Sequence, residues 1–290
     1  MNMIKDIISM MKIKHYIKNC VVFVPVLLSM QFLKFELYPN CLIIFLSFCF
    51  ISSAVYILND LFDIEKDKLH PTKSKRAIAS GRITKKTAIL SFLILLILSF
   101  SLVLFLNIPS FLCILSYLVL NILYSAYFKK IAIVDVFCIA LGFILRIISG
   151  CFAIGVLPSP LIILMTMFVS MFFTFSKRKL ELKYVKDKNL YRESIKDFNE
   201  NMVNQFILFN AVLSVSFYIT YVLDKTTIQR AGCEYLYITT IPFVPVILRL
   251  LFLVNSDKTD DDPMRFIEKD VPIRILFLLY ILILVIPATI

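Results

Sequence analysis

An uncharged run of 42 residues, from Thr87 to Phe128, is the feature that most constrains this chain of 290 residues. Other stretches with few or no charges lie at 37–59, 131–176, 201–223, 235–254 and 271–290. A transmembrane helix needs about 20 consecutive apolar residues. With 60% hydrophobic residues and a mean hydropathy of +0.87, the composition is typical of a polytopic helical membrane protein and excludes an ordinary soluble enzyme or a disordered chain.

Two turn signals divide the longest runs into separate helices. Asn107-Ile-Pro109-Ser110 splits the first run, and Gly155-Val-Leu-Pro158-Ser-Pro160 splits 131–176. A shorter run at 19–33 adds a first span and brings the total to nine. With the N-terminus in the cytoplasm, 25 of the 31 Lys and Arg residues fall in cytoplasmic segments and three in outer segments. This asymmetry predicts an all-α, multi-pass bundle of about nine spans in the cytoplasmic (inner) membrane, N-terminus inside and C-terminus outside.

The expected domain organisation is a single membrane-embedded catalytic domain over 1–290. Residues 1–14 have the pattern of an interfacial amphipathic helix, and 60–86 and 177–200 are the two long cytoplasmic loops, expected to carry the active site. The net charge of +11 comes from such loops and is not evidence for nucleic-acid binding, so the expected partner is the lipid bilayer and no nucleic acid. Seven cysteines without a C-x-x-C pair are interpreted as small buried hydrophobes.

An acidic cluster marks the point where the span 37–59 meets the loop 60–86. On one continuous helix, Asn59, Asp60, Asp63 and Asp67 share a face within 100° of arc. Three carboxylates on one face repel one another unless a cation lies between them, and such oxygen ligands suit Mg²⁺ held partly through substrate phosphates. The alternative is a solvated helix end with ordinary acidic residues.

Two basic clusters accompany the acidic one. In the loop 70–82, Lys73, Arg76 and Arg82 combine with hydroxyls and a glycine, a composition suited to charge-assisted hydrogen bonds with phosphate. After the sixth span come Lys177 and Arg178, with Glu181 placed to pair with them at i,i+4 and i,i+3. The alternatives are a topogenic basic loop and a surface cluster that ends a span.

Ionisable residues also occur within the predicted spans. Asp135 and Arg146 lie eleven residues apart, close to three helical turns, so both point the same way but stand roughly 16 Å apart. Intramembrane charges usually mark a cavity or pathway. We expect each to face one polar cavity at a different depth. A direct structural pair is the alternative, and the separation argues against it.

The chain resembles the UbiA superfamily of intramembrane prenyltransferases, because Asn59 to Asp67 fits its N-D-x-x-D-x-x-x-D motif. Within that superfamily it looks most like the decaprenyl-phosphate phosphoribosyltransferase branch. That likeness rests on Tyr16-Ile-Lys18-Asn19, His70-Pro-x-Lys73 with Ala79-Ser80-Gly81, Tyr124-Ser125 with Phe128-Lys129, Asp135-Val136, Gly142-Phe143-x-Leu145-Arg146 with Gly150, and Lys177-Arg178-x-x-Glu181-Leu182. Tyr16 stands where the branch usually has Trp, and Ala77 where it usually has Pro.

The resemblance implies a UbiA-like helical bundle and Mg²⁺-dependent transfer of 5-phosphoribosyl from phosphoribosyl diphosphate to a polyprenyl (decaprenyl-type) phosphate. Asn59, Asp60, Asp63 and Asp67 would hold the metal. Lys177, Arg178 and Glu181 would act with these aspartates in catalysis. Substrate binding would fall to Lys18, Asn19, Asn59, Lys73, Arg76, Arg82, Tyr124, Lys129, Asp135 and Arg146. The product would serve cell-envelope glycolipid synthesis, and the resemblance leaves a homo-oligomer open.

Two other functions stay open on the sequence. An aromatic or haem prenyltransferase shares the fold and the first motif, but carries a second acidic D-x-x-x-D motif after the sixth span, where this chain has Lys177-Arg178-x-x-Glu181. A nine-span transporter is the less favoured reading, because transporters commonly show internal repeats and polar sites at the midplane. Here the polar clusters gather at one membrane face. An active site facing the cytoplasm would admit a soluble donor there and a lipid acceptor from the bilayer.

Overall fold

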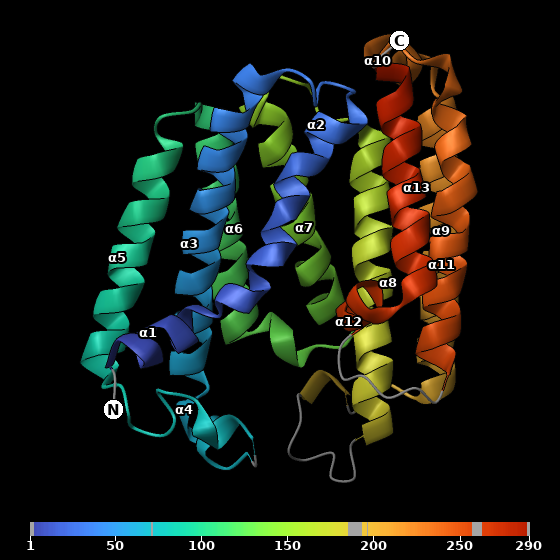
Figure 1. Ribbon diagram of the computed structural model, residues 1–290. Helices are drawn as coiled ribbons and strands as arrows, with labels where there is room; N and C mark the ends of the chain where they lie inside the picture. The colour runs from blue at the N-terminus through green and yellow to red at the C-terminus, as the bar shows by residue number, and fades with distance from the viewer. Residues whose placement is uncertain (1–2, 71, 185–192, 196, 257–262, 289–290) are drawn as a thin grey trace. The chain divides into compact units, whose positions relative to one another are not determined.

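The computed structural model describes residues 3–70, 72–184, 193–195, 197–256 and 263–288. All regular secondary structure in these ranges is helical (Figure 1). The long helices are α3 (Tyr38–Phe62), α5 (Lys85–Val103), α6 (Ile108–Ala126), α7 (Val134–Ala153), α8 (Pro160–Tyr184), α9 (Glu200–Leu223), α11 (Thr240–Asn255) and α13 (Val271–Ala288). The fold class predicted from the sequence is confirmed.

Shorter helices join and flank the long ones. The short α-helices are α1 (Met3–Met11), α2 (Val24–Leu28), α4 (Ile64–Lys68), α10 (Lys225–Ala231) and α12 (Met264–Lys269). The 3₁₀ segments are η1 (Ile13–Phe23), η2 (Phe35–Leu37), η3 (Lys73–Lys75), η4 (Phe128–Lys130), η6 (Glu193–Ile195) and η7 (Glu234–Thr239). Residues 71, 185–192 and 196 of the two predicted active-site loops lie outside the described residues.

Seven helices of the described chain are long and apolar enough to cross a membrane, and each lies on a span predicted from the sequence. The apolar segment Val271–Val285 coincides with the ninth predicted span. The run 19–33 differs, because it folds as η1 followed by the five-residue α2 instead of one long helix. The total of nine spans and their orientation stay predictions.

Local sequence explains where the helices begin and end. The predicted break at Asn107 separates α5 from α6, and the Asn107 side chain caps α6 by accepting a 2.9 Å hydrogen bond from the Ser110 amide. The second break lies between α7 and α8, where Gly155 takes a positive φ of 71° that few other residues adopt. Both turn signals were therefore interpreted correctly.

Internal contacts divide the chain into two compact units. Unit 1 comprises 1–24, 36–131 and 145–157, and unit 2 comprises 25–35, 132–144 and 158–290. The first half of α7 thus belongs to unit 2 and its second half to unit 1. This division rests on contacts between residues and does not test which part of the chain is catalytic. The single catalytic domain over 1–290 therefore remains a prediction.

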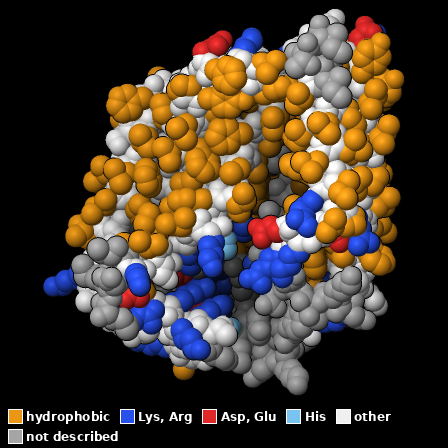
Figure 2. All heavy atoms as spheres, in the orientation of Figure 1, with side chains coloured by type: hydrophobic (Ala, Val, Ile, Leu, Met, Phe, Trp, Pro, Cys, Tyr) orange, Lys and Arg blue, Asp and Glu red, His pale blue; other side chains and the backbone are white. Residues whose placement is uncertain are grey.

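In unit 1, α3 is the central helix. It packs along α5 and against α6 and η1, and Ile44, Phe48 and Ile51 on α3 are fully buried. The outward residues of α5, such as Leu90 and Ile97, are exposed although they are apolar, as expected for a surface in contact with lipid. Figure 2 shows this apolar covering along the helices, with Lys and Arg gathered near α4 at their end.

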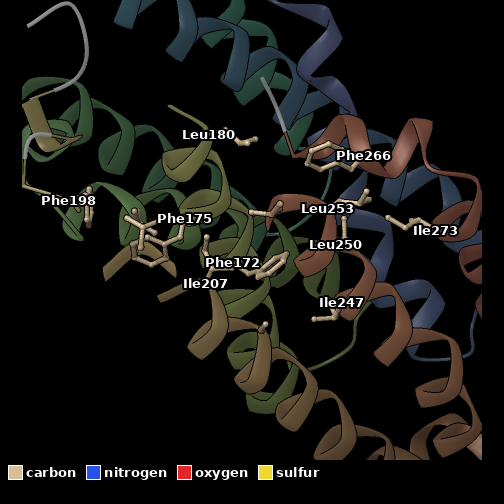
Figure 3. Close-up of a cluster of buried hydrophobic side chains, with 14 residues drawn as sticks. Phe172, Phe175, Leu180, Phe198, Ile207, Ile247, Leu250, Leu253, Phe266 and Ile273 are labelled. Atoms are coloured by element: carbon tan, nitrogen blue, oxygen red, sulfur yellow. The ribbon is translucent and has the colours of Figure 1, made fainter. Parts of the chain in front are cut away.

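In unit 2, α8 and α9 pack along each other, and α11 packs on α9 and α13. Their buried side chains form an apolar core rich in phenylalanine, including Phe172, Phe175 and Phe198 (Figure 3). The rings of Phe175 and Phe198 meet edge to face with their centroids 6.1 Å apart. Phe198 follows η6, so this contact fixes the chain just before α9 onto the core of unit 2.

Candidate functional site

The acidic motif in unit 1 does not lie on one continuous helix. α3 ends at Phe62, Asp63 leaves helical geometry with φ −97° and ψ 9°, and α4 begins at Ile64. The expected single helix is therefore interrupted, although the amides of Asp63 and Asp67 still donate i→i−4 hydrogen bonds to the carbonyls of Asn59 at 3.0 Å and Asp63 at 2.7 Å. Asp60 and Asp67 are buried, with 4% and 3% of their surface exposed, whereas Asp63 and Asn59 are half-buried.

Arg76 brings two of the three carboxylates together. Its Nη1 atom donates to Asp60 Oδ1 at 3.0 Å and to Asp67 Oδ2 at 2.7 Å. The side chain of Asp63 is directed elsewhere, since its Oδ1 accepts a 2.6 Å hydrogen bond from Lys129 Nζ. The structure thus brings Asp60, Asp67 and Arg76 into one cluster, and places Asp63 with Lys129 beside η4.

Lys12 completes the cluster and was not among the predicted site residues. Its Nζ atom lies 2.8 Å from Asp60 Oδ1 and 4.9 Å from the ring centroid of Tyr56. Burial lowers the pKa of Lys12, and the attraction of Asp60 opposes that shift. In the sequence Lys12 falls in an amphipathic segment 48 residues from Asp60, and no spacing rule connects the two.

Contacts with α3 and with the basic loop hold the N-terminal segment in place next to Lys12. Lys12 itself has the left-handed backbone conformation, φ 52° and ψ 47°, which ends α1 and turns the chain into η1. Ser53 Oγ on α3 donates a 2.8 Å hydrogen bond to the carbonyl of Met11, and Met10 packs with Ala77 and Ile78 of the basic loop. The helix α1 therefore contributes Met10 to the core of unit 1, with Ile7 and Met11 packed against it.

The basic loop is held by its own backbone and by α1. His70 Nδ1 accepts hydrogen bonds from the amides of Thr72 at 3.2 Å and Lys73 at 3.3 Å. Arg82 donates from Nε to Asp6 on α1 at 2.9 Å and from Nη2 to the Lys75 carbonyl at 2.9 Å. The loop therefore belongs to unit 1, as the acidic cluster does, and its Arg76 contacts Asp60 and Asp67.

The residues of unit 1 can hold a divalent cation at Asp60 and Asp67. Their carboxylate oxygens both accept hydrogen bonds from Arg76 Nη1, so the positive charge of Arg76 already lies between them. Carboxylate oxygens are ligands that Mg²⁺ accepts, usually with water or phosphate completing its shell. Among the described residues no three His, Cys, Asp or Glu side chains gather closely enough to form a metal cage by themselves. The donor set thus fits a metal that shares its ligands with a substrate.

Arg146, in the half of α7 that belongs to unit 1, lies in a separate buried network. Its Nε atom donates to Asn19 Oδ1 at 2.8 Å and its Nη2 to the Tyr117 hydroxyl at 3.0 Å. The guanidinium also lies over the rings of Phe48 and Tyr117, at 5.3 and 4.7 Å from their centroids. Asn19, on η1, is thereby fixed between Arg146 and α3, where it also donates to Ser52.

Asp135, in the half of α7 that belongs to unit 2, has different partners. Its Oδ2 atom accepts hydrogen bonds from Arg178 Nη2 at 2.8 Å and from Ser194 Oγ at 3.1 Å. Arg178 Nη1 in turn donates to Glu181 Oε2 at 2.6 Å, which confirms the predicted i,i+3 pairing. Asp135 and Arg146 therefore have different hydrogen-bond partners, and the expectation that both face one polar cavity stays a prediction.

The two cations of the Lys177–Arg178 cluster differ in how far they are buried. Arg178 has 2% of its surface exposed and is enclosed by Asp135 and Glu181, whereas Lys177 is half-buried and has no hydrogen-bond or ion-pair partner in the described part of unit 2. Ser194 on η6 was missed by the sequence analysis, because a serine 59 residues from Asp135 gives no signal. Lys18 on η1, Lys73 on η3 and Tyr124 near the end of α6 are half-buried in unit 1.

The chain is similar to known proteins in both sequence and fold. The model of the UbiA prenyltransferase family matches residues 22–281. The chain is 24% identical to a decaprenyl-phosphate phosphoribosyltransferase of Mycolicibacterium smegmatis, over 97% of this chain and 91% of that protein. It is also 35% identical to the uncharacterised protein y4nM of Sinorhizobium fredii. That match covers 61% of this chain and only 34% of the length of y4nM.

A solved structure has the same fold. A UbiA homologue from Archaeoglobus fulgidus, bound to DMAPP and Mg²⁺, superposes with a TM-score of 0.71 at 18% identity, over 97% of this chain and 99% of that one. The family model covers most of the chain, and the relatives and the fold agree with it. The chain therefore belongs to the UbiA prenyltransferase family.

Proposed function

We propose that this protein transfers 5-phosphoribosyl from phosphoribosyl diphosphate to a polyprenyl phosphate, releasing diphosphate. The observation that carries the proposal is the cationic sequence Lys177-Arg178-x-x-Glu181 on α8, where aromatic prenyltransferases of the superfamily have a second acidic motif. The similarity to a decaprenyl-phosphate phosphoribosyltransferase over almost the whole chain supports it. Family membership also favours a transferase over the transporter.

The reaction explains why cations suit this position better than carboxylates. An oxygen of the lipid phosphate forms a bond to the anomeric carbon of the ribose, while the bond from that carbon to the diphosphate oxygen breaks. The attacking oxygen is already anionic near neutral pH, since the second pKa of a phosphate is about 6, so no general base is needed. The main difficulty is to bring two polyanions together, and additional Lys and Arg residues reduce their repulsion.

In this proposal the acidic motif holds the leaving group through a metal. Asp60 and Asp67, assisted by Asn59 and Asp63, would hold Mg²⁺, which when bound neutralises the diphosphate as it departs. The convergence of Asp60 and Asp67 on Arg76 supports their pairing as ligands. The structure of the A. fulgidus homologue with Mg²⁺ supports use of a divalent cation in this family.

Different cations of the site would bind different phosphate groups of the two substrates. Donor phosphates would be bound by Lys73, Arg76 and Arg82. Lys129 and Lys177 would bind the donor 5-phosphate or the lipid phosphate. Arg178 is enclosed by Asp135 and Glu181. We therefore propose that Arg178 and Glu181 act in catalysis together by positioning Lys177 and α8. Tyr124 and Asp135 would orient sugar hydroxyls or cations, and Lys18, Asn19 and Arg146 would shape the polar part of the binding site.

A prenyl transfer to an aromatic acceptor is the second candidate, and one observation favours it. The A. fulgidus homologue of the same fold was solved with DMAPP, a prenyl diphosphate. Such a reaction would use Asp60, Asp63 and Asp67 in the same way for the donor diphosphate. It would leave the Lys177–Arg178 cluster without a phosphate to bind, and for this reason we place it second.

The test is an assay of the purified protein in detergent with Mg²⁺, labelled phosphoribosyl diphosphate and a polyprenyl phosphate. The proposal predicts that label enters the lipid phase and that removal of Mg²⁺ by a chelator stops the transfer. Absence of label in the lipid, together with release of diphosphate from a prenyl diphosphate and an aromatic acid, would contradict it. The site is further proposed to face the cytoplasm, where the soluble donor is made.

A further inference from the structure

The acidic cluster of unit 1 is balanced in charge by the chain itself. Asp60 and Asp67 carry two negative charges, and Lys12 and Arg76 carry two positive charges within 2.7–3.0 Å of their oxygens. Asp60 Oδ1 accepts from both cations, and Asp67 Oδ2 accepts from Arg76. Both carboxylates are almost fully buried, so solvent screens these interactions little.

We propose that Lys12 and Arg76 are positioning residues that occupy the place of the divalent cation, and that the cation binds tightly only when it replaces them together with a diphosphate. The inference rests on the metal assignment of the proposed function, but not on which group is transferred. One divalent cation carries the same charge as the two side chains that it displaces. The exchange therefore leaves the buried carboxylates balanced, provided that Lys12 and Arg76 find new anionic partners.

A bare cation cannot supply those partners. If Mg²⁺ bound to Asp60 and Asp67 alone, Lys12 and Arg76 would be left beside it, and the cluster would carry an excess of two positive charges. Like charges held a few ångströms apart in a poorly solvated site repel strongly. A diphosphate brings anionic oxygens that Lys12 and Arg76 can bind, so the metal and the diphosphate are expected to bind with strong mutual coupling.

The surrounding structure allows the two side chains to move without unfolding the segments that carry them. α1 remains attached through the Arg82–Asp6 pair and through the hydrogen bond from Ser53 to Met11. The basic loop remains attached through the packing of Ala77 and Ile78 on α1 and α3. The exchange thus requires new side-chain conformations of Lys12 and Arg76 and no displacement of α1 or of the loop.

A purely structural role for Lys12 makes a different prediction. If Lys12 only fastened α1 to α3, its loss would loosen the cluster and would leave cation and diphosphate binding unchanged or weaken both. If Lys12 stands in for the metal, its loss removes a competitor of the bare cation and also a ligand of the diphosphate. The two affinities must then change in opposite directions, which loss of folded protein cannot produce.

The experiment compares Lys12→Met with Lys12→Arg, which keeps the charge, and with Lys14→Met, a control at an exposed lysine two residues away. Binding of Mn²⁺ alone is measured by the electron paramagnetic resonance signal of free Mn²⁺, with purified full-length protein in detergent. Binding of labelled inorganic diphosphate is measured at saturating Mn²⁺. Neither readout depends on turnover or on the identity of the acceptor.

We expect Lys12→Met to bind bare Mn²⁺ about tenfold more tightly and to bind diphosphate with Mn²⁺ about tenfold more weakly than the wild type, as loss of one charge in a part-buried site implies. Lys12→Arg and Lys14→Met should match the wild type in both measurements. Unchanged or weaker Mn²⁺ binding by Lys12→Met would overturn the inference alone. Absence of Mn²⁺ binding by the wild type, with or without diphosphate, would overturn the metal assignment as well.

Discussion

At the residue scale, the protein pairs each buried or half-buried acidic group of the candidate site with a cation. Asp60 and Asp67 meet Lys12 and Arg76, Asp63 meets Lys129, and Asp135 meets Arg178. The sequence analysis identified all these residues except Lys12, because residue type and motif spacing indicate chemistry directly. It predicted the i,i+3 pair of Arg178 with Glu181 but not these pairs, because each of them is formed across 9 to 66 residues of chain.

A substitution at Asp63 tests the metal assignment without an expected change in the fold. Asp63→Asn keeps the size of the side chain and a hydrogen bond to Lys129, but removes a charge that we assign to holding the metal and diphosphate. We expect turnover to fall about 100-fold or more while the thermal unfolding midpoint stays within a few degrees. Glu65→Gln, at an exposed carboxylate on α4, is the matched control and should retain wild-type turnover. Wild-type activity in Asp63→Asn would refute the role of Asp63 in holding the metal and the diphosphate.

Asp135 tests the stability of unit 2. Its partner Arg178 is 2% exposed, and among the described residues its ion pairs are with Asp135 and Glu181, so Asp135→Asn removes one of these two carboxylates from a buried guanidinium. Removing one partner of a buried ion pair costs about 3 kcal/mol of the free energy of unfolding. We expect a clear decrease in the unfolding midpoint in detergent, whereas Asp197→Asn, at an exposed position of the same unit, should leave it unchanged. Equal stability of the two variants would show that the pair contributes little.

At the element scale, uncharged runs and turn residues were sufficient to place most helices, and the exceptions have local causes. The run 19–33 has the composition of a span but includes Pro25, and Met30 adopts a positive φ of 56°, so the chain forms η1 and α2 instead of one helix. The motif 59–67 has helical spacing, but the chain leaves the helix at Asp63. Periodicity describes an uninterrupted helix and cannot locate such breaks.

The basic loop should respond to pH through His70. Burial lowers the pKa of His70, and Lys73 and Arg76 lower it further while Asp67 opposes them. The neutral ring accepts the amide hydrogen bonds of Thr72 and Lys73 at Nδ1, whereas the protonated ring can only donate. This stabilisation is therefore fully present above about pH 6.5, the ordinary pKa of histidine, and is lost as the pH falls below it.

Hydrogen exchange of the Thr72 and Lys73 amides measures this effect directly. We expect their protection factors to decrease as the pH is lowered from 7 to 5 in the wild type. His70→Asn, whose amide oxygen accepts hydrogen bonds at every pH, should keep its protection over the same range. Equal pH dependence in the wild type and His70→Asn would show that another group controls the loop.

At the scale of the whole molecule, composition and charge asymmetry predicted an all-α membrane protein, and family membership agrees with that prediction. The long acidic motif was specific enough to indicate the family, because four polar residues at fixed spacing beside a membrane span seldom occur by chance. The substrate is a harder inference. It depends on a few cations such as Lys177, and a lysine binds any phosphate that reaches it.

The most direct test of the account is a competition between donors. Purified protein in detergent would receive Mg²⁺, equal concentrations of phosphoribosyl diphosphate and a prenyl diphosphate, and both a polyprenyl phosphate and an aromatic acid, with the products identified by mass spectrometry. We predict a phosphoribosylated lipid phosphate, formed in amounts equal to the diphosphate released. A prenylated aromatic product with phosphoribosyl diphosphate left unconsumed would contradict the account.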